Sequence, residues 1–240
     1  MSRKPILAVD RDLRNFDFLA DYFSDTRSEC VTAAPEESLA SFRKYRPGYV
    51  FADFKGESSR FVSEFLTGIS GGPVRIFGAH IPDCPESVPV IRLESPYDLK
   101  TFQPVVFSVL PFPEILKVLT IDDDRDICEG IQDFLSFRKG PSFRVESASN
   151  GLEGFRKIES FRPDVTILDI KMPVKNGIDL CREIRRKNPD LRMIVLTSTV
   201  SADEILELRK SGVPAFAEKG ASGGTFPELL NLIKKQWLFS

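Results

Sequence analysis

The chain has 240 residues, of which 42% are hydrophobic and 28% are charged, so it is long enough for one large globular domain or two of ordinary size. Its formal net charge of −2 excludes a bulk attraction to nucleic acid or to an anionic membrane. No apolar run approaches the roughly 20 residues that span a bilayer, and the first residues, MSRKPILAVD, lack the long apolar core and cleavage site of a signal peptide.

Short apolar runs bounded by turn residues recur through the first half and predict buried strands. A helical pattern follows them at residues 98–110. Strands that alternate with helical patterns imply a parallel sheet with right-handed crossovers. The predicted strands of this half lie at residues 6–9, 30–33, 49–53, 74–77 and 90–93.

A proline-rich step, Pro111-Phe112-Pro113, marks the boundary between the halves. Proline is disfavoured inside helices and strands and is common in the segments that connect them. Two prolines within three residues indicate a short, stiff linker. We therefore expect two domains, residues 1–112 and 113–240.

The second half alternates strands and helices more clearly than the first. The pattern predicts an α/β protein made of two flavodoxin-like, doubly wound (βα)5 domains, each with a parallel five-stranded sheet. The predicted strands of the second half lie at residues 115–121, 143–147, 165–169, 193–197 and 215–217, and its helices at 126–137, 151–161, 177–187, 202–211 and 225–237.

The two halves resemble each other. PILAVDRDLRNF near the N-terminus matches KVLTIDDDRDI, which begins at Lys117, and YRPGYVFADFK matches FRPDVTILDIK, which begins at Phe161. This alignment places Asp53 on Asp169. Because the period is about half the chain, the repeat indicates two similar domains and not a solenoid.

Cysteine and histidine usage narrows the chemistry. Cys30, Cys84, Cys128 and Cys181 lie far apart and form no CxxC pair, which favours reduced thiols in a cytoplasmic protein. The single histidine, His80, excludes zinc sites built on several histidines and disfavours histidine general-base chemistry. We interpret His80 as a solvated loop residue.

Acidic residues end two predicted strands of the second half. Asp122, Asp123 and Asp124 follow the first strand, and Asp169 ends the third, which lies beside the first in a flavodoxin-like order. Carboxylates this close repel, so protonation or a cation must neutralise some of them. Oxygen ligands without Cys or His favour a hard cation such as Mg²⁺ over zinc.

A hydroxyl and an ammonium group are expected at the same edge. Thr197 ends the fourth strand, and the fifth runs into Lys219. A carboxylate nucleophile at Asp169, a bound cation, a hydroxyl and a lysine are the groups that phosphoryl transfer to an aspartate requires. The sequence therefore predicts an acyl phosphate on Asp169.

With these residues in place, residues 115–240 resemble the receiver domain of two-component response regulators. The resemblance implies that Asp122 and Asp123 hold Mg²⁺ and that Asp169, in LDIKMPVKNG, is the phosphoacceptor. It also implies that Lys219 binds the phosphoryl group.

The resemblance assigns further roles. Thr197 matches the switch hydroxyl, Phe216 the aromatic residue that rotates on activation, and Lys171 the residue whose backbone carbonyl binds the metal. The chain departs from the family at Gly220, where proline is usual after the lysine, and at Ser198, which is larger than the usual Ala or Gly.

The first half is a degraded copy of this pattern. Asp10 and Asp53 keep two carboxylates, whereas Arg11 stands at the second acid, Gly78 at the hydroxyl and Ser95 at the lysine. We expect Arg11 to occupy the metal's place and to pair with Asp53 or Asp10, which would keep the carboxylate ionised without a cation. This half is then an adaptor or dimerisation module that takes no phosphate.

The leading hypothesis is a response regulator that accepts phosphate on Asp169 from a histidine kinase or phosphotransfer protein. It would phosphorylate and dephosphorylate itself, without a separate enzymatic output, and signal through the face of its fourth and fifth helices. A homodimer is a further expected partner. The basic cluster at 182–187 is too small to argue for direct contact with nucleic acid, and no membrane partner is expected.

Two other functions remain open. The chain is alternatively the regulatory part of a larger output enzyme, such as a diguanylate cyclase, although its 240 residues contain no cyclase or nucleotide-binding motif. It is alternatively a phosphorylation-independent adaptor, which the departure at Gly220 favours.

Overall fold

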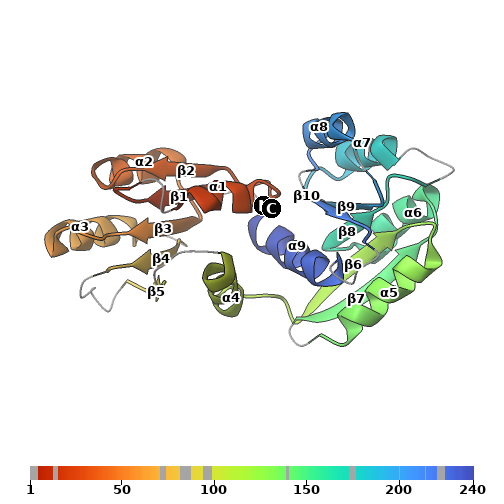
Figure 1. Ribbon diagram of the computed structural model, residues 1–240, viewed down its shortest axis with the longest axis horizontal. Coiled ribbons are helices and arrows are strands. Elements are labelled where there is room, and N and C mark those ends of the chain that lie inside the picture. The colour runs from red at the N-terminus through yellow and green to blue at the C-terminus, as the bar shows by residue number, and fades with distance from the viewer. Residues whose placement is uncertain are drawn as a thin grey trace. The chain divides into compact units, whose positions relative to one another are not determined.

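The computed structural model describes residues 5–12, 16–70, 74–81, 88–93, 99–138, 141–172, 177–199, 201–213, 215–220 and 225–240. Within these residues the chain forms two compact units, which divide between Leu110 and Pro111. Each unit contains one five-stranded sheet, and Figure 1 labels the elements of both. In the described part of the chain, no helix has the length and apolar character needed to cross a membrane.

The first unit is a parallel sheet with strand order β2-β1-β3-β4-β5. In the connection between β4 and β5, residues 80–89, no helix appears among the described residues. The elements in chain order are β1 (Ile6–Val9), α1 (Asp17–Phe23), β2 (Cys30–Ala33), the 3₁₀ helix η2 (Pro35–Glu37), α2 (Ser38–Tyr45), β3 (Tyr49–Asp53), α3 (Ser59–Ile69), β4 (Arg75–Ala79), β5 (Val90–Arg92) and α4 (Leu99–Val109).

The second unit is a parallel sheet of order β10-β9-β8-β6-β7. In both units the first strand lies between the second and the third, which is the flavodoxin-like order, so the predicted α/β fold is confirmed. The elements are β6 (Ile115–Ile121), α5 (Arg125–Ser136), β7 (Ser142–Ala148), α6 (Gly151–Phe161), β8 (Val165–Leu168), α7 (Gly177–Lys187), β9 (Arg192–Thr197), α8 (Ala202–Lys210), β10 (Ala215–Glu218) and α9 (Thr225–Phe239).

Helices cover both faces of the second sheet (Figure 1), with α6, α7 and α8 on one face and α5 and α9 on the other. Alternate residues of β6 face opposite layers: Leu119 and Ile121 pack with the first group, Leu116 and Val118 with the second. Because both faces are covered, the strands read as continuous apolar runs. All residues of β8 are buried for this reason.

Aromatic side chains fill one layer of the first unit. Phe51 of β3 packs against Phe77 of β4 and Phe102 of α4, with ring centroids 4.8 Å and 5.1 Å away, and against Phe23 of α1 at 6.0 Å. Aromatic pairs at these distances contribute beyond their buried area. The first unit therefore has a hydrophobic core of its own.

The repeat also appears in the backbone. Helices α2 and α6 both end at an arginine in the left-handed conformation, Arg46 with φ 47° and Arg162 with φ 52°. Each arginine N–H bonds back to its helix, to the carbonyl oxygens of Phe42 and Ile158 respectively. A proline that follows each arginine prevents the helix from continuing. The Arg-Pro step of both sequence repeats is thus a helix stop before the third strand.

Candidate functional site

Two buried aspartates lie side by side at the carboxyl ends of β6 and β8. Ile121 pairs with Leu168 in the parallel register, so the next residues, Asp122 and Asp169, leave the sheet together. The Asp169 N–H donates to the carbonyl oxygen of Ile121 at 2.9 Å. The two aspartates are only 2% and 4% exposed, so their charges need compensation.

Asp123 completes an acidic cluster with these two residues. One carboxylate oxygen from each of Asp122, Asp123 and Asp169 lies within 4.8 Å of the others. Asp124 turns away and caps α5, where its side chain accepts hydrogen bonds from the N–H groups of Asp126 and Ile127. The structure therefore brings together the three predicted metal-binding carboxylates.

Lys219 supplies the positive charge. It follows β10, where its backbone N–H donates to the Thr197 carbonyl oxygen at 2.9 Å. Its Nζ atom lies 2.6 Å from Asp169 Oδ2 and 2.7 Å from Asp122 Oδ2. Burial disfavours the ammonium ion, but its hydrogen bonds with the two carboxylates outweigh that effect and raise the pKa of Lys219. One cation is shared between the two buried acids.

The carboxyl of Asp122 is under-compensated in this arrangement. Burial raises its pKa above the ordinary value, and this effect exceeds the lowering by Lys219 and by the N–H of Asp124. A divalent cation held by oxygen ligands would restore the balance. The donor set of Asp122, Asp123 and Asp169 fits Mg²⁺, which prefers carboxylate oxygens and retains several waters.

The loop after Asp169 is fixed by short-range contacts. The Lys171 N–H donates to Asp169 Oδ1 at 2.8 Å. Gly177, the first residue of α7, lies so close to this loop that a Cβ atom would come within 2.2 Å of Ile170 Cα. Residues 173–176, including Pro173, fall outside the described residues, and the Lys171 carbonyl as a metal ligand stays a prediction.

The two predicted switch residues lie on neighbouring strands. Thr197 ends β9, is 1% exposed, and its hydroxyl donates to the Thr199 carbonyl oxygen at 3.4 Å. Phe216 lies in β10 opposite Val195 and is partly buried against the apolar layer of α6, α7 and α8. Ser198 is exposed, next to Thr197.

The corresponding site of the first unit is neutralised differently from our expectation. Asp10 and Asp53 are 4% and 2% exposed at the same two strand ends. The prediction that Arg11 pairs with one of them is wrong: its guanidinium lies 2.6 Å from Glu57 Oε1. The Arg11 side chain is 67% exposed, and pairing with Glu57 spares it the desolvation that entry between the aspartates requires.

His80 contacts Asp53, where we expected Arg11. His80 is an exposed loop residue, as interpreted, but its Nδ1 atom also lies 2.8 Å from Asp53 Oδ1. Its backbone is left-handed, with φ 47°, a conformation that histidine adopts more readily than most residues. The imidazole contributes a polar partner to a buried carboxylate.

The sheet register gives His80 the position of Thr197. Gly78, predicted to hold that position, lies inside β4, where a Cβ atom would come 2.0 Å from Ile81 Cδ1. The Ser95 position falls outside the described residues. In the second sheet, Leu168, the residue before Asp169, pairs with Val195, and Thr197 follows Val195 by two positions. In the first sheet, Ala52, the residue before Asp53, pairs with Gly78, and His80 follows Gly78 by two positions.

Comparison with known proteins concerns the second unit. Residues 118–231 match the family described as the response regulator receiver domain. Response regulator MprA of Mycobacterium ulcerans (strain Agy99) is 37% identical over 103 residues, which are 43% of this chain and 41% of that protein. The chain thus spans about two fifths of the length of the curated relatives it matches.

Solved receiver domains give matches of similar extent. A CheY-like response regulator receiver domain protein from Methanospirillum hungatei JF-1 is 26% identical, with a TM-score of 0.47, and the match covers 51% of this chain and 94% of that one. A response regulator receiver domain protein from Clostridium thermocellum is 30% identical, with a TM-score of 0.45 and coverage of 51% and 94%.

Proposed function

From the match of residues 118–231 to the response regulator receiver domain family, we propose that the chain accepts a phosphoryl group on Asp169 in a two-component signalling pathway. The observation that carries the proposal is the position of Lys219, whose ammonium group contacts both Asp169 and Asp122 at the carboxyl edge of the sheet. A carboxylate nucleophile next to a fixed cation is what phosphoryl transfer to oxygen needs.

The donor of the phosphoryl group is a phosphohistidine on a histidine kinase or phosphotransfer protein. A carboxylate oxygen of Asp169 forms the new O–P bond while the P–N bond to the imidazole breaks. The electron pair of that bond stays on the imidazole nitrogen, which takes up a proton. Lys219, held beside Asp169, would stabilise the charge on the transferred phosphoryl oxygens as a point charge.

Mg²⁺ would be held by the carboxylates of Asp122, Asp123 and Asp169, with the Lys171 carbonyl as a further oxygen. When bound, it supplies neutralisation of the phosphoryl oxygens. The support for this assignment is the oxygen-only donor set and its spacing. The protein's own contribution is to keep Asp122 and Asp169 buried and fixed by backbone hydrogen bonds.

Phosphorylation then acts as a switch. We assign Thr197 as the hydroxyl that moves to the phosphoryl group and Phe216 as the aromatic residue that turns inward. The population of the active form rises only to the extent that the phosphoryl group stabilises the active form more than the inactive one. The interaction surface that changes is the face of α8 and α9, and a protein target or a second copy of the chain would bind it in the cytoplasm.

The first unit, residues 1–112, serves as an adaptor or dimerisation module that takes no phosphate. Its Asp53 is held by His80, and its Arg11 is engaged by Glu57. Asp53 also accepts the backbone N–H of Lys55, but among the described residues no lysine side chain forms an ion pair with it. The second unit, residues 113–240, is the phosphoacceptor.

The test is intact-mass analysis after incubation with acetyl phosphate and Mg²⁺, using wild type, Asp169→Asn and the matched control Asp53→Asn. Wild type and Asp53→Asn should gain one phosphoryl group, and Asp169→Asn should gain none. Labelling that survives Asp169→Asn would refute the proposal. Loss of labelling in Asp53→Asn would show that the first unit reacts.

A second measurement separates switching from a phosphorylation-independent adaptor role. Beryllofluoride with Mg²⁺ mimics an acyl phosphate, and a ligand that binds only the folded state raises the unfolding temperature. We expect a rise for wild type and none for Asp169→Asn. An unchanged unfolding temperature in wild type would favour the adaptor.

A further inference from the structure

Helix α8 is weakly anchored by apolar contacts. Of its residues, Ala202–Lys210, only Leu208 is buried, whereas Leu206 is 53% exposed. Helix α7 beside it buries Ile178, Leu180, Cys181 and Ile184. Apolar burial contributes most of the free energy that docks a helix, so α8 depends on other contacts to a greater extent than α7.

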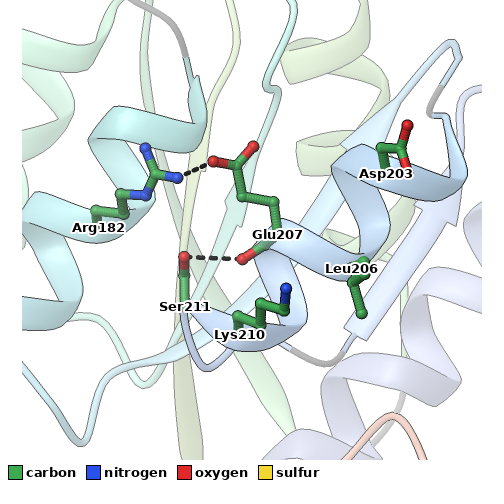
Figure 2. Close-up of a pocket in the computed structure, with 6 residues that line it drawn as sticks. All are labelled: Arg182, Asp203, Leu206, Glu207, Lys210 and Ser211. Carbon is green, nitrogen blue, oxygen red and sulfur yellow. Dashed lines mark hydrogen bonds and ion pairs between the residues drawn. The ribbon is translucent and has the colours of Figure 1, made fainter.

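Two ion pairs provide those contacts. Arg182 of α7 reaches Glu207 of α8 across a shallow pocket, where Ser211 also donates to the Glu207 carbonyl oxygen (Figure 2). Lys171, in the loop after Asp169, lies with its Nζ atom 2.6 Å from Glu204 Oε1. The first pair fixes the middle of α8 and the second fixes its first turn.

Glu204 performs two tasks at the start of α8. Its Oε2 atom accepts the Ser201 N–H at 2.8 Å, while the Ser201 hydroxyl accepts the Glu204 N–H, so the two residues form a capping box. Hydrogen bonds from Lys171 and from Ser201 lower the pKa of Glu204 to about 2. The carboxylate that caps α8 is therefore also the charged partner of Lys171.

Lys171 in turn touches the phosphoacceptor. Its backbone N–H donates to Asp169 Oδ1 at 2.8 Å, and its side chain holds Glu204. A continuous chain of contacts thus runs from the Asp169 carboxylate through a single residue to the capped end of α8. A change of charge at Asp169 alters the acceptor of the Lys171 N–H and so the position from which Lys171 reaches Glu204.

We propose that Lys171 and Glu204 form a latch that holds α8 in its present position and couples it to the state of Asp169. The latch is a regulatory contact of the same site, so its input rests on the proposed function, whereas its hold on α8 does not. An interaction that stabilises only one of two arrangements shifts the population toward it by its own free energy. Opening the latch frees α8 to move.

Hydrogen exchange of the full, unphosphorylated chain tests the hold on α8. Lys171→Met removes the ammonium group. Glu204→Gln removes the charge but keeps the capping box, because glutamine also serves at that position. A partly exposed ion pair of ordinary strength predicts roughly two- to five-fold faster exchange of residues 202–210 in each variant. The double variant should exchange no faster than either single one, because both lose the same contact.

Arg125→Met is the matched control, because Arg125 forms an exposed ion pair with Glu129 inside α5 and should leave α8 unchanged. Exchange of α8 at the wild-type rate in Lys171→Met and Glu204→Gln would overturn the latch. Additive acceleration in the double variant would also overturn it, since the two residues would then act separately.

Beryllofluoride affinity tests the coupling to Asp169. Glu204→Gln should bind beryllofluoride with Mg²⁺ tighter than wild type, by about the same factor by which α8 exchange accelerates. Unchanged affinity in a variant with accelerated α8 exchange would overturn the coupling. A wild type that binds no beryllofluoride would refute the proposed function and with it the coupling, whereas the exchange measurement alone decides the hold on α8.

Discussion

The Nδ1 atom of His80 lies 2.8 Å from Asp53 Oδ1, so the first unit carries a histidine at the position where the second carries Thr197. The Asp53 side chain is 2% exposed, and removing a partner from a buried carboxylate is costly. We predict that His80→Ala lowers the free energy of unfolding of the first unit by about 1–2 kcal/mol.

Urea unfolding of the full chain, followed by aromatic fluorescence and circular dichroism, measures this effect. Arg60→Ala in α3 of the same unit is the control, because the side chains of Arg60 and its ion-pair partner Glu64 are 88% and 60% exposed; we expect little change. Equal effects of the two substitutions would show that the His80 contact does not stabilise Asp53.

Lys219 is the shared partner of two buried carboxylates. Its removal should therefore lower the free energy of unfolding most when no divalent cation is present. Breaking a buried ion pair by removing one partner predicts a loss of about 3 kcal/mol for Lys219→Met. Added Mg²⁺ should raise the unfolding temperature of the variant more than that of wild type, because it replaces the missing positive charge. Calorimetry with EDTA and with Mg²⁺ checks both parts, and an equal Mg²⁺ effect on the two proteins would contradict the prediction.

Gly177 packs against the loop that carries Asp169. A methyl group there would meet the backbone of Ile170 at 2.2 Å, which no side-chain movement relieves, so Gly177→Ala should destabilise the second unit by about 3 kcal/mol. Gly68→Ala in α3 is the matched control. The new methyl group meets only the end of Leu39 at 2.9 Å, and alanine favours a helix over glycine by about 0.5–1 kcal/mol. Thermal unfolding should therefore separate the two variants clearly.

The buried Cys181 thiol should not react with alkylating agents in the folded protein. Burial raises its pKa from 9.0 to about 12, so its contribution to stability is complete below the unfolded value and is lost as the pH rises toward the folded one. Alkylation by iodoacetamide, quantified peptide by peptide at increasing pH, should label the partly buried Cys30 before Cys181. Urea should abolish the difference, and early labelling of Cys181 without urea would contradict its burial. Cys30, Cys128 and Cys181 are free thiols, and Cys84 lies outside the described residues.

Much of the second site followed from the sequence because its groups come directly after apolar strands. Once β6, β8, β9 and β10 are recognised, the parallel arrangement brings their following residues to one edge. Asp122, Asp169 and Lys219 therefore lie together in the structure as the motif predicts. The roles assigned to them stay predictions until phosphorylation is measured.

The partners of side chains in loops did not follow in the same way. Arg11 pairs with Glu57 and not with an aspartate, and His80 replaces Gly78 at the hydroxyl position because the register of β4 differs from the one counted along the sequence. Nothing in the spacing of these residues distinguishes one partner from another. A sheet register for the first half would have found His80.

The sequence by itself determined the α/β fold, the repeat and the strand ends that carry acidic groups, because periodicity and turn residues are local properties. Only the tertiary structure decided that His80 holds Asp53, that Glu57 holds Arg11 and that Lys171 holds Glu204. These partners are 27, 46 and 33 residues apart in the chain. Their pairing depends on strand register and loop geometry, which the packing of the whole unit sets.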